Sequence, residues 1–128
     1  MDLETLERKL AERNAKVGKL KQNLYRKLAA QLPDDLEVCA AGEGLSNENG
    51  SYAPVIVSPN TVYIARGAGA FGQAELVGFA RDTITAVEVS GRILRKLTIV
   101  TVEGPFIVTA MSKKQARAIA EELEAGGR

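Results

Sequence analysis

Residues 97–123 read LTIVTVEGPFIVTAMSKKQARAIAEEL. The β-branched residues of 97–102 are typical of a strand, and Glu103-Gly104-Pro105 is a tight break before a second apolar run at 106–108. A helix is expected to begin at Ser112, because Gln115 follows it at the capping-box spacing. The apolar stripe of this helix consists of Ala116, Ile119, Ala120 and Leu123. A strand pair that leads directly into an amphipathic helix constrains the fold more than any other stretch.

The chain upstream of this stretch has the pattern of further strands. Its 128 residues, 45% of them hydrophobic, are enough for the core of a single domain. We expect seven strands, at 36–41, 53–58, 61–66, 74–79, 83–89, 96–102 and 105–109. Ser58-Pro59-Asn60 predicts a turn after the second, and Gly91 lies in a loop after the fifth. No intervening run is long and periodic enough for a crossover helix, so the sheet should be mainly antiparallel.

Residues 1–32 have a helical rather than a strand pattern. Apolar residues recur at spacings of three, four and seven, which predicts one long amphipathic helix that Pro33 ends. The stripe consists of Leu3, Leu6, Leu10, Val17, Leu20, Leu24 and Leu28. Gly18 weakens the helix by about 1 kcal/mol relative to alanine, so the helix should need a partner surface. The expected organisation is a helix at 1–32 and a β domain at 33–128.

The charges nearly cancel but are segregated along the chain. There are 17 basic and 16 acidic residues, so composition gives no sign of a nucleic-acid-binding protein. Residues 1–32 have eight basic against four acidic residues, whereas residues 33–111 have five against nine. One side of the predicted helix carries Lys9, Lys16, Lys19, Arg26 and Lys27. Such a basic face can dock on an acidic protein surface or on an anionic membrane, and packing against protein is favoured because tryptophan and phenylalanine are missing from the helix.

The residue types argue against an enzyme. The chain has no histidine, the commonest general base and metal ligand, and its single cysteine, Cys39, reads as a small core residue. We therefore expect no catalytic residue, metal, cofactor or small-molecule substrate. One cysteine cannot form an intramolecular disulfide, which is typical of a cytoplasmic protein. The glycines of Gly67–Gly72 spell a dinucleotide-binding pattern, but Gly78 falls where the following helix would be required, so a hairpin loop is favoured.

Several of the predicted strands together resemble a known family. Residues 55–64, VIVSPNTVYI, with 80–89, ARDTITAVEV, and 96–101, KLTIVT, are similar to strands of bacterial pleckstrin-homology (PH) domains of the YokE-like type. The resemblance covers about residues 33–125 and implies a seven-stranded antiparallel partial barrel capped by the C-terminal helix. Eukaryotic relatives that bind phosphoinositides use a basic cluster between the first two strands. Here that loop, Gly42–Ser51, has no lysine or arginine, so no lipid-contact residue carries over.

These observations lead to two hypotheses of different classes. The favoured one is a non-enzymatic PH-like scaffold whose N-terminal helix contacts a protein partner or a second copy through Leu3, Leu6, Leu10, Val17, Leu20 and Leu24. The alternative is a peripheral membrane protein that holds anionic lipid with Lys9, Lys16, Lys19, Arg26 and Lys27.

Overall fold

The computed structural model describes residues 1–48, 50–66 and 75–126. Within these ranges seven strands form a single antiparallel sheet in the order β4-β3-β2-β1-β7-β6-β5, which leaves β4 and β5 as edges, so the sheet is not closed. The strands are β1 (Ala40–Ser46), β2 (Tyr52–Val57), β3 (Thr61–Arg66), β4 (Glu75–Ala80), β5 (Ile84–Ser90), β6 (Arg95–Thr101) and β7 (Gly104–Met111). The predicted mainly β fold with flanking helices is confirmed at this level.

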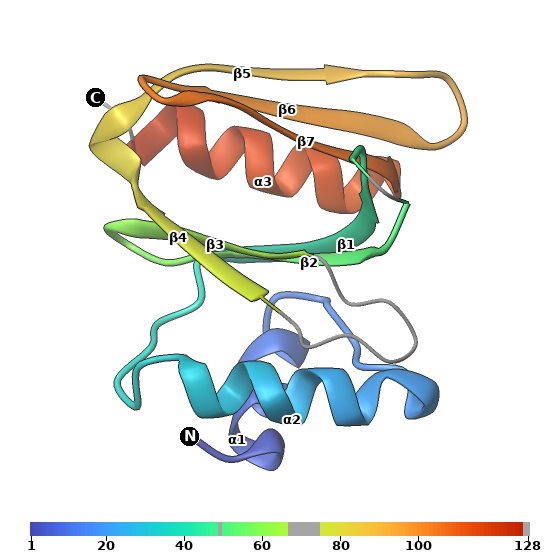
Figure 1. Ribbon diagram of the computed structural model, residues 1–128, viewed down its shortest axis with the longest axis vertical. Coiled ribbons are helices and arrows are strands. Elements are labelled where there is room, and N and C mark those ends of the chain that lie inside the picture. The colour runs from blue at the N-terminus through green and yellow to red at the C-terminus, as the bar shows by residue number, and fades with distance from the viewer. Residues whose placement is uncertain (49, 67–74, 127–128) are drawn as a thin grey trace.

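The sheet folds back on itself at β1. Its first residues pair with β2, from Ala40 opposite Val57 to Leu45 opposite Tyr52, and its last two pair with β7. Figure 1 shows the result, with β1–β4 and β5–β7 as two halves that face each other across the last helix, α3 (Lys113–Gly126). Ala116, Ile119 and Leu123 of that helix lie in the core between the halves.

The start of α3 follows the predicted cap only in part. Ser112 Oγ accepts a hydrogen bond from the backbone N–H of Gln115 at 3.2 Å, as the spacing predicts. The Gln115 side chain, however, accepts a hydrogen bond from the backbone N–H of Glu43 at 3.1 Å, so it ties α3 to β1.

Arg81 fixes the other end of α3. This side chain is only 7% exposed, and its guanidinium donates to the carbonyl oxygens of Ser58 (3.1 Å) and Glu122 (2.8 Å) and to the Glu122 carboxylate (3.2 Å). It lies in a short 3-10 turn, η2 (Arg81–Thr83), that leads into β5. Because unpaired carbonyls at a helix C-terminus attract cations, Arg81 satisfies that end while joining it to the β2–β3 turn.

The first predicted strand requires correction. Residues 36–39 are not in a strand, and β1 runs instead through Ser46, across a segment that was predicted to be a loop. Gly42 and Gly44 explain the error, since glycine usually weakens a strand. A Cβ on Gly42 would lie 2.9 Å from Gln115 Cβ, and one on Gly44 would lie 2.3 Å from the carbonyl oxygen of Thr109. Both glycines are needed where α3 and β7 approach β1 closely.

The prediction of a single long N-terminal helix is also wrong. Residues 1–32 form α1 (Leu3–Ala11), the short turn η1 (Lys19–Lys21) and α2 (Gln22–Gln31). Asn14 has φ of 61° just after α1, a left-handed conformation that asparagine tolerates and that ends helices. The break lets α1 and α2 lie together under the same sheet half (Figure 1), whereas 32 residues of straight helix would extend about 48 Å.

The N-terminal helices pack on the outer face of β1–β3. A second core joins them to the sheet, and the sheet contributes Ala41, Ile56 and Ala65. The helices and the connection to β1 contribute Leu6, Leu10, Ala15, Tyr25, Leu28, Ala29, Leu32, Leu36 and Val38. Strands β1–β3 are therefore covered on both faces, by α3 inside and by α1 and α2 outside.

Candidate functional site

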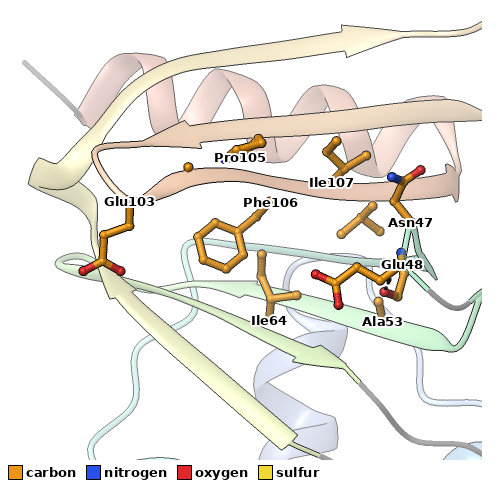
Figure 2. A pocket seen from close by; sticks show the side chains of 11 residues that line it. Asn47, Glu48, Ala53, Ile64, Glu103, Pro105, Phe106 and Ile107 are labelled. Carbon is orange, nitrogen blue, oxygen red and sulfur yellow. Dashed lines mark hydrogen bonds between the residues drawn. The ribbon is translucent and has the colours of Figure 1, made fainter.

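A cavity of about 320 Å³ opens between the two sheet halves. Its interior is apolar, and Figure 2 shows Phe106 of β7 and Ile64 of β3 pointing toward each other across it. Its remaining lining residues are Ser46, Asn47, Glu48, Ala53, Glu103, Gly104, Pro105, Ile107 and Val108. The cavity thus combines an apolar floor with two carboxylates from separate turns.

The two carboxylates, Glu48 and Glu103, lie in short turns that are held by hydrogen bonds. Glu48 follows β1, where the Ser46 Oγ accepts from the Glu48 N–H at 3.3 Å and the Ser46 carbonyl accepts from the Gly50 N–H at 2.8 Å. Glu103 lies in the β6–β7 turn, where its own N–H donates to Thr101 Oγ1 at 3.1 Å. Gly104 provides a φ of 127° in that turn. Both glutamates are exposed, so the rim of the cavity carries two acidic side chains.

Phe106 also bridges the two halves by contacting the edge strand β4. Its ring stacks on that of Phe79 in β4, with centroids 4.6 Å apart and planes at 13°. Aromatic pairs of this kind add about 0.5–1.5 kcal/mol beyond the area they bury. The pair connects β4 to β7, which are not neighbours in the sheet, through side chains alone.

The leucine stripe predicted as a contact surface mostly faces the chain's own sheet. Leu6 and Leu10 are 0% and 2% exposed. Leu3, Val17 and Leu24 are half-buried against the same core. Leu20, in η1, differs because it is 98% exposed. The contact hypothesis assumed that nothing in the N-terminal segment covers this stripe. For Leu6 and Leu10 the chain's own sheet is the covering surface, so they are not available to a partner.

The predicted basic face is spread over α1, η1 and α2. Lys9 is half-buried and its Nζ donates to the carbonyl of Leu36 at 2.5 Å, so it serves the internal packing. Lys16, Lys19, Arg26 and Lys27 are exposed. Arg26 donates to the side chain of Asn23 at 2.9 Å. Four of the five cations thus remain accessible to an anionic partner.

A polar cluster joins α2 to β1 and β2. The Tyr25 hydroxyl is 3.1 Å from the Glu43 carboxylate, to which it donates, and 3.1 Å from the Tyr52 hydroxyl. Lys21 Nζ lies 4.0 Å from the centroid of the Tyr52 ring. Burial, followed by the charge of Glu43, raises the pKa of Tyr25 well above its ordinary value. Tyr25 therefore stays neutral and acts as a structural donor.

Cys39 is partly buried against the inner core. Burial is also the main cause that raises the pKa of its thiol. A raised pKa lowers the thiolate fraction at neutral pH and with it the reactivity of the group. The geometry thus agrees with a packing role.

Other sequence features give no site within the described residues. The glycine motif Gly67–Gly72 lies outside them. In the ranges that the structure does describe, no three His, Cys, Asp or Glu side chains are grouped so that they could hold a metal ion. None of the helices found there has the length and apolarity that a bilayer-spanning helix needs.

Sequence patterns did not point to the cavity. Its residues come from the end of β1, the start of β2, the middle of β3 and the β6–β7 hairpin, which are distant in sequence. Phe106, Ile64 and Ala53 each read as ordinary strand residues. A loop ending at Ser51 and the Glu103-Gly104-Pro105 break were both predicted, but only the fold-back at β1 brings Asn47, Glu48 and Glu103 to the same opening.

No protein-family model matches the chain, and a search of curated proteins finds no match.

Proposed function

We propose that the chain is a PH-like, non-enzymatic module that binds a protein segment in the cavity between its sheet halves. The observation that carries the proposal is the pairing of an apolar interior, formed by Ile64 and Phe106, with exposed carboxylates at Glu48 and Glu103. The complementary ligand is a peptide with one apolar anchor side chain next to lysine or arginine.

The size and build of the cavity support this ligand class. Small-ligand pockets have volumes of about 300–1,000 Å³, and this one is near the lower limit at about 320 Å³. An anchor side chain with some backbone fits such a space, and a buried anchor surrounded by a polar rim is the usual arrangement of a binding hot spot. The order of elements and the bent antiparallel sheet are consistent with a PH-like domain.

The experiment is a selection from a displayed library of random peptides against the full chain. We expect enriched peptides to combine a large apolar residue with lysine or arginine. Affinity is then measured by fluorescence polarisation for the wild type and for Glu103→Lys, whose side chain is exposed in a turn. Reversing a rim charge should weaken binding at least tenfold, since like-charge juxtaposition costs several kcal/mol.

The matched control is Glu88→Lys, which makes the same change at an exposed position of β5 that does not line the cavity. Its affinity should equal that of the wild type. Equal loss in both variants, or enrichment of acidic peptides, would contradict the proposal.

A membrane role for the N-terminal cations is the second candidate. The exposure of Lys16, Lys19, Arg26 and Lys27 is the observation in its favour. This candidate requires that changing both Arg26 and Lys27 to glutamine weakens binding to anionic vesicles, and it is rejected if that variant binds them as the wild type does.

A further inference from the structure

The tip of the β5–β6 hairpin exposes two large aliphatic side chains. Residues 91–94 connect β5 to β6, and within them Ile93 is 89% and Leu94 55% exposed. The sequence around them is Arg92-Ile93-Leu94-Arg95-Lys96, so the pair is flanked by cations on both sides. Transfer of such exposed apolar side chains from water into an apolar environment is favourable.

Specific backbone geometry and hydrogen bonds define the turn that presents these side chains. Gly91 has φ of 105°, and a Cβ there would lie 2.5 Å from the Leu94 carbonyl oxygen, so other residues would strain the turn. The Arg95 guanidinium donates through Nη1 to the carbonyl oxygens of Gly91 and Arg92. Arg95 thus braces the backbone, while Ile93 and Leu94 are left facing solvent.

More cations lie beside the tip at the start of α3. Arg95 pairs with Met111 in the sheet, which brings the beginning of α3 to the hairpin end of the β5–β7 half. Figure 1 shows this hairpin and the start of α3 at the same end of the molecule. Arg95, Lys113 and Arg117 line one surface depression together with Val89, Ala120 and Glu121.

The resulting surface is predominantly basic. Its cations are Arg92, Arg95, Lys96, Lys113, Lys114 and Arg117, and none of them forms a salt bridge with another described residue. All but Arg95 are exposed. We name these six residues with Ile93 and Leu94 the basic hairpin surface.

We propose that the basic hairpin surface docks on an anionic lipid bilayer, with Ile93 and Leu94 inserted among the headgroups. The apolar part of this surface consists of Ile93 and Leu94 alone, whereas a standard protein interface buries about 800 Å² on each side around a larger apolar centre. A bilayer needs only a few apolar side chains at a tip, provided that cations around them meet anionic headgroups. This membrane contact goes beyond the proposed peptide binding, since Glu103 of the cavity lies in the β6–β7 turn at the opposite end of β6.

The charge contribution is tested with the full chain and vesicles. Cosedimentation is measured with mixed phosphatidylcholine–phosphatidylglycerol vesicles and with pure phosphatidylcholine vesicles. We expect binding to the mixed vesicles only, weakening as salt rises. Changing Arg92 and Lys96 to glutamine should weaken partitioning about 25-fold, because each cation near an anionic surface contributes about fivefold. Arg95 is left unchanged because it braces the turn.

The control changes Arg26 and Lys27 to glutamine, which removes the same charge from exposed positions of α2. Its partitioning should stay within about threefold of the wild type because screening weakens charges far from the contact. If the α2 variant loses as much binding as the hairpin variant, or if the wild type does not bind the mixed vesicles at low salt, the proposal is overturned.

Insertion has a separate readout, because the chain has no tryptophan. Ile93→Trp places one fluorophore at the tip, and Val102→Trp places one at a 72% exposed position in the β6–β7 turn. With mixed vesicles, the emission of the tip variant should shift to shorter wavelength and be quenched by brominated lipid. The Val102→Trp emission should not change. Vesicle binding without a shift at position 93, or equal shifts in both variants, would contradict insertion of the tip.

Discussion

Strands β2 and β5 belong to the same sheet but have opposite environments. Every residue of β2 after Tyr52 is buried, because α3 covers one face and α1 and α2 cover the other. In β5 only Ile84 and Val87 are half-buried and the other residues are exposed. The covered half is a structural layer, whereas the β5–β7 half has an outer face and hairpin ends that are open to partners.

This difference was partly visible in the sequence. The unbroken apolar run Ala53–Val57 is typical of a strand buried on both faces, while Thr85, Glu88 and Ser90 give β5 a polar character. The leucine stripe of residues 1–32 is the complementary signal. The stripe indicates that the N-terminal segment needs a covering surface, but whether that surface is the chain's own sheet, a partner or a membrane comes only from the structure.

The break between α1 and α2 could not be read from spacing. Leu10 and Val17 are seven residues apart, which continues a helical stripe, yet the chain turns between them at Asn14. Leu36 and Val38 show the same limit, since their apolar character correctly indicates burial but not a strand. Periodicity reports which side chains are buried, whereas close approaches in three dimensions decide the backbone path.

The largest expected effect is at the buried contact of the N-terminal helices. Leu28 is 0% exposed in the core shared with Ile56, so Leu28→Ala should lower the free energy of unfolding by about 3 kcal/mol. Leu20→Ala, which makes the same change at a 98% exposed position, should change it by less than about 0.5 kcal/mol. Denaturant unfolding measures both. If both variants lowered the free energy of unfolding by similarly small amounts, the helices would not be a structural layer.

A smaller effect is expected at the polar seam between α2 and the sheet. Tyr25→Phe removes the hydroxyl that contacts Glu43 and Tyr52, and should cost about 1 kcal/mol of unfolding free energy at neutral pH. Tyr63→Phe, at a half-buried tyrosine of the same core, is the control and should cost less.

The seam also predicts a pH dependence. The pKa of Tyr25 is raised on folding, so its contribution is complete below the unfolded-state value of about 10 and declines as pH rises above it. Wild type should therefore lose more stability than Tyr25→Phe in alkaline solution. An equal loss of stability in the two proteins would mean that the Tyr25 side chain is exposed to solvent in the folded protein.

The contrast between the two halves is tested most directly by native-state hydrogen exchange of the full chain. If α2 is an integral layer, the amides around Leu28 and Ala29 should open with the same free energy as those of β2, by global unfolding. Amides at the β5–β6 tip should exchange through local opening at much lower free energy. Exchange of α2 by local opening, with β2 still protected, would contradict the account and make the helices a detachable arm.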